Sequence, residues 1–167
     1  MKPALSLIAA SVFLLSACGG SSSDSSIPGL KADTNIALLS RGASASSSHN
    51  SSNANNLIDG NNNNTSWTSE PDTPIIISLK KEEAIKSIKL TRLAESASTG
   101  DNPDILIELS INSVFIPINK NNNTVTCSNT QTLITCNMDP RQTNAIRITS
   151  KNGRSYLFFE LEAFATK

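Results

Sequence analysis

The stretch ILIELSI, from Ile105 to Ile111, carries the residue alternation that decides the fold of this chain. Its odd-numbered positions are all Ile or Leu, and Leu106, Glu108 and Ser110 fall between them. Successive side chains of a β-strand point to opposite faces of the sheet, so a two-residue period predicts a strand with one buried face. We therefore expect residues 105–111 to form a strand that packs on a hydrophobic core.

Similar short segments lie on both sides of it. We expect strands at 74–79, 85–93, 105–111, 114–118, 125–127, 133–136, 145–149 and 156–164, separated by clusters of Asn, Ser, Asp and Gly that favour turns. A helical turn or two is expected at 53–58. About eight short strands and no long amphipathic helix predict an all-β protein, an antiparallel β-sandwich of jelly-roll type.

The first 17 residues have the character of a signal peptide. Lys2 precedes an apolar run at 4–15 that is too short to span a membrane. The run ends in LSAC at 15–18, which resembles the lipobox of bacterial lipoproteins, where the signal is cut before a cysteine that is then lipidated. An ordinary signal peptide is the alternative. Several acyl chains, such as palmitate, on Cys18 would give stable membrane anchoring.

The next segment, 18–32, contains GGSSSDSS and cannot bury apolar surface, so we expect a flexible tether. Since no acidic residue directly follows Cys18, the lipoprotein resemblance implies the outer membrane of a bacterial cell envelope. Residues 33–167 then form one compact domain of roughly 135 residues, large enough for its own core.

Charge and cysteine content narrow the class of partner. The chain has 14 basic and 14 acidic residues, so its balanced charge does not favour binding to nucleic acid.

With Cys18 assigned to lipid, Cys127 and Cys136 remain as a pair in a compartment where disulfides persist. The residues between them predict strand, turn and strand. We expect a disulfide across this hairpin rather than two free thiols, and no metal site, because further ligands are missing.

The segment SSNANNLIDGNNNNTSW, residues 51–67, is rich in side-chain oxygens around a glycine. A hard cation such as Ca²⁺ prefers carbonyl and carboxylate oxygens on a backbone that turns sharply. Asn and Gly supply this backbone freedom because both tolerate positive φ. The segment predicts a calcium site, with an ordinary asparagine-rich turn as the alternative.

Several motifs together resemble the discoidin domain, also called the coagulation factor type C domain. They are NIA at 35–37, ASASS at 43–47, NA at 53–54, LIDGN at 57–61, TSW at 65–67, PIIISL at 74–79, IRIT at 146–149 and FELEAF at 159–164. The resemblance covers about residues 34–165, although 94–141 matches weakly. It implies the galactose-binding-like sandwich shared with many bacterial carbohydrate-binding modules.

The resemblance also implies a structural calcium ion, because family members often hold one between the D-G-N turn and the last strand. Carried onto this chain, the carboxylates are those of Asp59 and Glu160, and Thr65 gives a hydroxyl or carbonyl oxygen. Backbone carbonyls would come from Asn56, Asn61 and Phe159. The asparagine run looks one residue longer than the family's. The alternative to a calcium site is that Asp59 only forms a turn and that Glu160 faces solvent. Trp67 is expected in the core beneath this segment.

The related carbohydrate-binding modules hold sugar at the end of the sandwich that bears the metal-side loops. The polar candidates there are His49, Arg92 and Asn102. An aromatic partner is missing, since the Phe and Tyr residues fall in or near expected strands. Loops at 40–53 and 94–102 are too polar for the phospholipid binding of the blood-clotting relatives.

An enzymatic function is not expected. His49 lies in a serine-rich loop, but no G-x-S-x-G elbow or orienting acid is recognisable. Asp101 and Asp104 flank a proline in an expected turn, which is not the arrangement of a glycosidase pair. The sequence predicts a monomeric, lipid-anchored, non-catalytic module that binds carbohydrate or another extracellular ligand. The alternative is an accessory lipoprotein that has lost sugar binding and docks a partner protein.

Overall fold

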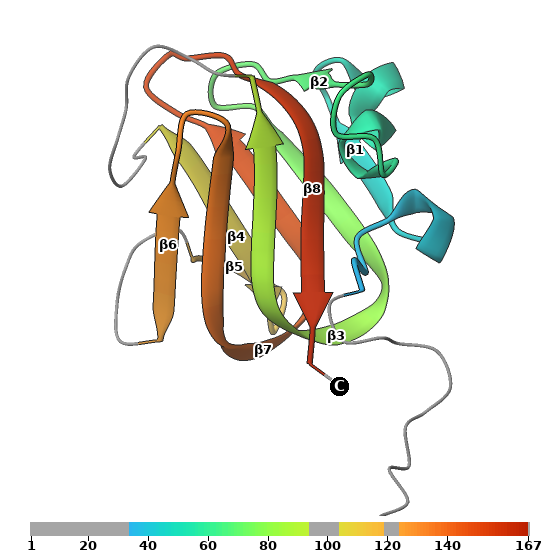
Figure 1. Ribbon diagram of the computed structural model, residues 1–167, viewed down its shortest axis with the longest axis vertical. Coiled ribbons are helices and arrows are strands. Elements are labelled where there is room, and N and C mark those ends of the chain that lie inside the picture. The colour runs from blue at the N-terminus through green and yellow to red at the C-terminus, as the bar shows by residue number, and fades with distance from the viewer. Residues whose placement is uncertain (1–33, 94–103, 119–123, 167) are drawn as a thin grey trace, which may run out of the picture.

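The computed structural model describes residues 34–93, 104–118 and 124–166, which form an antiparallel β-sandwich (Figure 1). The elements are η1 (Leu39–Arg41), β1 (Ser44–Ser47), η2 (Ser51–Ile58), β2 (Trp67–Thr68), β3 (Pro74–Arg92), β4 (Ile105–Ile111), β5 (Val114–Pro117), β6 (Val125–Asn129), β7 (Leu133–Ser150) and β8 (Leu157–Ala165). The predicted all-β jelly-roll architecture is confirmed. The predicted signal peptide, tether, Cys18 and Asn102 lie outside the described residues.

Two long strands, β3 and β7, pass through both layers of the sandwich. In one layer the first part of β3 pairs with β1 and with the end of β7, which continues to β4 and β5. In the other layer the second part of β3 lies between the start of β7 and β8, with β6 and β2 outside them. Figure 1 shows this second layer in front and β4 and β5 behind it.

The strand boundaries expected at the corners were wrong. We expected separate strands at 74–79 and 85–93, yet β3 is continuous from Pro74 to Arg92, with a register shift between Ser78 and Glu83. The KKEE residues at 80–83 therefore form a corner rather than a loop. Likewise β7 runs continuously through Asp139 and Pro140. Charged residues and a proline are tolerated there because the corner is exposed, as both of these β7 residues are.

The core fills the space between the layers with aliphatic side chains from alternate strand positions. Its fully buried members include Ile75, Ile77, Ile85, Ile88, Leu90, Ile105, Ile107, Leu109, Ile146, Ile148 and Leu161. The alternation at 105–111 places Ile105, Ile107 and Leu109 inside, as predicted. Burying one such side chain contributes about 1.5–3 kcal/mol, so this interior makes the sandwich a rigid support for its loops.

The expected disulfide is present between β6 and β7. Cys127 and Cys136 lie directly opposite each other, with Cα atoms 4.1 Å apart. By closing a short loop, the bond stabilises the domain by on the order of 2–3 kcal/mol in the chain-entropy description. It holds the edge strand β6 to the long strand β7 at one side of the front layer.

Candidate functional site

The asparagine hook, residues 56–65, begins in the last residues of η2 and is closed by its own polar groups. Gly60 has φ +86°, a left-handed conformation that favours glycine. The Asp59 Oδ1 atom accepts a hydrogen bond from the Asn61 N–H at 2.8 Å. The Thr65 hydroxyl donates to Asp59 Oδ2 at 2.6 Å. The Asp59 carboxylate is thus the centre of the turn and joins its two ends.

A carboxylate from the last strand faces this hook. Glu160 on β8 is only 1% exposed, and its Oε2 atom accepts a hydrogen bond from the Gly60 N–H at 3.1 Å. Its Oε1 atom is buried and has no hydrogen-bond partner among the described residues. Glu160 therefore does not face solvent, and the two segments, 100 residues apart in sequence, converge as the calcium prediction required.

The surroundings of Glu160 disfavour its charged form. Burial raises the pKa of Glu160 to about 7, and the nearby Asp59 carboxylate raises it as well. The backbone N–H groups of Gly60 and Asn61 act in the opposite direction, since they stabilise the ionised carboxylate. A buried carboxylate with one unsatisfied oxygen and a second carboxylate nearby is an environment that a cation would complete.

The donor set of the hook fits a calcium ion with few charged ligands. The described residues contain no group of three or more His, Cys, Asp and Glu side chains that could hold a metal. Any cation here would therefore combine Asp59 and Glu160 with neutral oxygens, as Ca²⁺ sites commonly do. The Asn56 side chain donates to the Ser66 carbonyl at 2.9 Å, so it fastens the hook. The carbonyls of Asn56, Asn61 and Phe159 stay predicted ligands.

Trp67 packs beneath the hook, as expected. It is 1% exposed, and its ring stacks on Phe158 with centroids 6.2 Å apart. Its indole N–H donates to the His49 carbonyl at 3.2 Å. The indole thereby connects the loop that carries His49 to the start of β8.

The start of β8 brings two of the predicted ligand residues to one end of the sandwich. Phe158 has Trp67 as its neighbour on one side and Arg92 on the other. Because adjacent strands lie about 4.8 Å apart, the His49 loop and Arg92 flank the same strand end. We call this end, with the loops 69–73, 128–132 and 151–155, the loop end. Asn102 is outside the described residues.

His49 and Arg92 differ in accessibility. The His49 side chain is 37% exposed, and its Nδ1 atom lies 3.2 Å from a Glu70 carboxylate oxygen. Arg92 is 4% exposed, and its guanidinium donates to Asn129 Oδ1 at 3.0 Å and to the Thr130 carbonyl at 3.1 Å. His49 can meet a ligand directly, whereas Arg92 holds the 128–132 loop in place. Ligand contact by either residue stays a prediction.

The sequence analysis missed a polar cluster around Asp104. This residue is 9% exposed at the start of β4, and it accepts hydrogen bonds from Asn152 and, at 3.4 Å, from the Tyr156 hydroxyl. Arg154 lies 3.6 Å from the same carboxylate. The neighbouring Lys151 ammonium lies 3.0 Å from Asp72 Oδ1 at the loop end. The K-N-G-R sequence at 151–154 was the available signal, a polar turn that carries two cations.

None of the aromatic rings that follow residue 33 forms an open platform. The chain has one Trp, one Tyr and five Phe, and residues 94–103 and 119–123 contain none of them. Trp67, Tyr156, Phe158 and Phe164 are buried, whereas Phe115 and Phe159 are half-buried. The described part of the loop end therefore offers hydrogen-bonding groups rather than a ring on which a ligand could stack.

Comparison with known proteins places these features in a family. The profile of the F5/8 type C domain matches residues 42–161. Among solved structures, the module CpGH89CBM32-6 produced by Clostridium perfringens aligns with a TM-score of 0.60 at 21% identity, over 80% of this chain and 100% of that chain. No match was found among curated proteins.

Two further structures were solved with sugars. The family 32 carbohydrate-binding module of C. perfringens NanJ, in complex with galactose, aligns with a TM-score of 0.59 at 22% identity, over 78% of this chain and 98% of its own. The CBM32 of AlyQ, in complex with 4,5-unsaturated mannuronic acid, aligns with a TM-score of 0.54 at 19% identity, over 74% and 95%. At such identities the likeness shows a shared fold.

Proposed function

The chain belongs to the F5/8 type C domain family, and from that premise we propose that it is a non-catalytic module that binds carbohydrate at the loop end. The observation that carries the proposal is the group of exposed hydrogen-bonding side chains on a rigid sandwich. His49, Glu70, Asp72, Lys151 and Arg154 surround the start of β8. Planar and charged groups of this kind pair with sugar hydroxyls, and the solved relatives in complex with sugars support the same ligand class.

A second function is favoured by the buried aromatic rings. Carbohydrate sites commonly use an open ring under the C–H face of a sugar, and this chain offers none at the loop end. The charged groups there would equally suit a polar partner protein. The alternative proposal is an accessory lipoprotein that docks such a partner through the same residues.

A glycan array followed by calorimetry separates the two functions. The wild-type protein is expected to bind one class of neutral or acidic oligosaccharide, and His49→Ala to weaken that binding by about tenfold through the loss of one hydrogen-bonding group. Lys81→Ala is the matched control, because Lys81 is 71% exposed at the far corner of β3. Each variant's melting temperature is measured in parallel.

The outcome on the array decides between the proposals. Binding that His49→Ala weakens and Lys81→Ala leaves unchanged supports the sugar site. A protein that binds no glycan at millimolar concentration, in calcium or in chelator, contradicts sugar binding and leaves partner docking.

We also propose that a structural calcium ion binds between the asparagine hook and β8. Asp59, Thr65 and Glu160 would hold it, together with the predicted backbone carbonyls. The ion would supply the positive charge that the two carboxylates lack and would not take part in chemistry. The unpartnered Oε1 atom of Glu160 supports this proposal. Its consequences for stability are developed in the Discussion.

We further propose that Cys18 is lipidated and anchors the protein in the outer membrane of a bacterial envelope. Acylation there would tether the domain to a membrane surface. No helix in the described part of the chain is long and apolar enough to cross a bilayer. In a bacterial host, Cys18→Ala is expected to shift the protein from the membrane fraction to the soluble or unprocessed fraction, with fractionation and mass spectrometry as the readout. Unchanged membrane partitioning after signal cleavage would contradict lipidation.

A further inference from the structure

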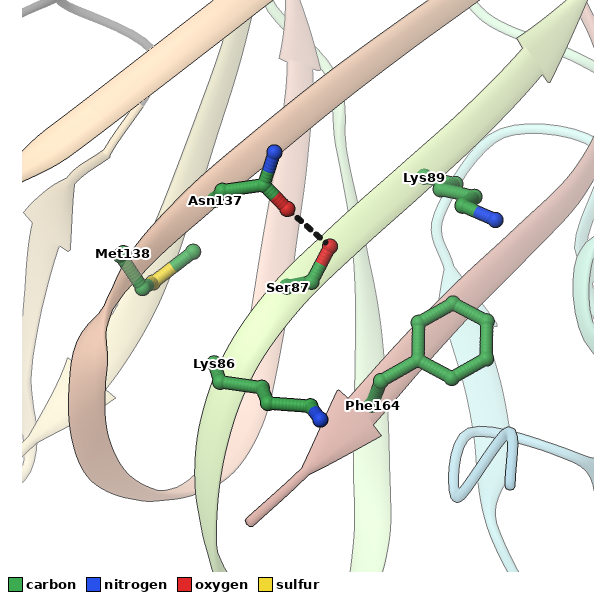
Figure 2. A pocket seen from close by; sticks show the side chains of 6 residues that line it. All are labelled: Lys86, Ser87, Lys89, Asn137, Met138 and Phe164. Atoms are coloured by element: carbon green, nitrogen blue, oxygen red, sulfur yellow. Dashed lines mark hydrogen bonds between the residues drawn. The ribbon is translucent and has the colours of Figure 1, made fainter. Parts of the chain in front are cut away.

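A groove of about 550 Å³ lies on the outer face of the front layer, away from the loop end and the hook (Figure 2). Its lining residues come from the three central strands of that layer, β3, β7 and β8. They are Lys86, Ser87, Lys89, Asn137, Met138 and Phe164. Its size is that of a small-ligand site.

The strand register explains why most of these side chains, Met138 excepted, share one face. Ser87 on β3 is paired with Asn137 on one side and with Phe164 on the other, so the three form a row across the layer. Lys89 lies two residues further along β3 and therefore points to the same face. Strict alternation would send Lys86 to the opposite face. A register shift between Ile85 and Ser87, present toward both neighbouring strands, turns it into the groove.

The polar groups of the groove favour an oxygen-rich anion. Two of the six lining residues are lysines and none is acidic. The Ser87 hydroxyl and Asn137 Oδ1 lie 2.9 Å apart in a hydrogen bond, which engages the acceptor atom of the amide (Figure 2). The groove thus presents mainly donors and positive charge to a ligand.

The apolar part of the groove lies beside its cations. The Lys89 ammonium is 5.0 Å from the centroid of the Phe164 ring, a cation–π contact that holds the ammonium over the ring. Met138 and Phe164 are each 8% exposed, so they offer a small apolar floor. A sugar acid carries a carboxylate and an apolar C–H face on one ring. The lysine ammonium groups suit the carboxylate, and the apolar floor beside them suits the C–H face.

A carboxylate near the groove opposes the binding of an anion. Glu162 on β8 is the cross-strand partner of Lys89 and therefore faces the same side. It lies outside the six lining residues, in the next row of the layer. Its removal should strengthen the binding of an anion, whereas removal of either lysine should weaken it.

We propose that this groove is a second carbohydrate-binding surface, distinct from the loop end, that takes a hexuronate unit of an acidic polysaccharide. The lysine ammonium groups pair with the carboxylate, and Ser87 and Asn137 bind ring hydroxyls. The occupant is a sugar acid rather than a neutral sugar because the lining is cationic. The proposal does not depend on whether the loop end binds sugar.

Tetragalacturonate titrated at low salt tests the groove, with neutral galactotetraose as the matched ligand. Lys89→Gln and Lys86→Gln are each expected to weaken uronate binding by about fivefold, the upper range for one exposed charge pair. Glu162→Gln is expected to tighten it by a factor of about two to five. Lys81→Gln at the corner of β3 is the control for net charge and should change little.

Competition experiments separate the sources of negative charge. Poly-glutamate and vesicles that contain phosphatidylglycerol should displace tetragalacturonate poorly, since neither offers ring hydroxyls. His49→Ala should leave uronate binding unchanged even if it abolishes neutral glycan binding, so failure of one site is distinguishable from failure of the other. Equal binding by the lysine variants and the wild type overturns the proposal. Displacement by poly-glutamate or by vesicles at equal charge concentration also overturns it, in favour of an acidic protein or a membrane surface.

Discussion

The melting temperature of this domain is expected to fall by on the order of 10 °C when calcium is removed with a chelator. An ion that binds only the native state contributes about 2.7 kcal/mol at a hundredfold excess over Kd. For a domain of roughly 135 residues, 1 kcal/mol corresponds to about 3–5 °C. The effect is large because the ion would join the hook to β8, two segments 100 residues apart that are otherwise linked here by the Gly60–Glu160 hydrogen bond.

Charge-removing variants identify the ligands. Asp59→Asn keeps an oxygen that can accept the Asn61 N–H and removes one carboxylate, so the turn should survive while the calcium response is lost. In chelator this variant should stay close to the wild type in stability, because it loses the Thr65 hydrogen bond to Asp59 Oδ2 but also removes repulsion from Glu160. Asp72→Asn, at the loop end, is the control and should respond to calcium as the wild type does.

Scanning calorimetry with and without calcium provides the measurement. A wild-type melting curve that does not change between calcium and chelator, together with no bound ion by isothermal titration, contradicts the calcium proposal. The hook would then be an ordinary turn, stabilised by hydrogen bonds such as those of Asp59 with Asn61 and Thr65.

The metal-free domain is expected to lose stability as the pH rises from about 5 to 8. The pKa of Glu160 in the folded protein is about 7, against an ordinary value of 4.5. A raised carboxyl pKa means that the fold favours the protonated form. Its contribution is therefore complete below the unfolded pKa and is lost as the pH rises through about 7. At about 1.4 kcal/mol per pKa unit, the loss above that pH is on the order of 3 kcal/mol.

Glu160→Gln isolates this effect from other titrating groups. The variant keeps a polar side chain that cannot ionise, so it should be more stable than the metal-free wild type at pH 8 and should have a flatter profile. Saturating calcium should flatten the profile of the wild type as well, because the ion stabilises the ionised carboxylate. The measurement is urea unfolding between pH 4.5 and 8.5 in chelator. A wild-type profile that matches the variant's would show that Glu160 does not titrate in this range.

The two proposed binding surfaces would give the protein different ligands on one scaffold. The loop end has paired polar groups, as in the Lys151–Asp72 ion pair and the contact between His49 and Glu70, which suits neutral sugars with many hydroxyls. The groove of the front layer has two lysines. A polysaccharide with neutral and acidic units could engage both surfaces, and linked sites of this kind raise overall affinity without new contacts.

The alternation at 105–111, the apolar run at 74–79 and the Cys127–Cys136 pair were sufficient to predict a disulfide-linked antiparallel sandwich, because each pattern depends on neighbours near in sequence. The motifs at 57–61, 65–67 and 159–164 predicted that the hook and the last strand meet. The motifs could do so because the order of such short segments is characteristic of this family, to which residues 42–161 are matched.

Only the tertiary structure decided features that depend on register and burial. The corners at 80–83 and 139–140 resemble breaks in the sequence because their residues are charged or proline, yet β3 and β7 continue through them with shifts in the pairing register. The buried state of Arg92 and the cluster around Asp104 require loops from distant strands to meet at one end. The groove requires the register shift between Ile85 and Ser87, which turns Lys86 to the face of Ser87, and no local pattern reveals it. Sequence periodicity determines which side of a strand a residue occupies only while the register is regular, so where it shifts the packed layers decide.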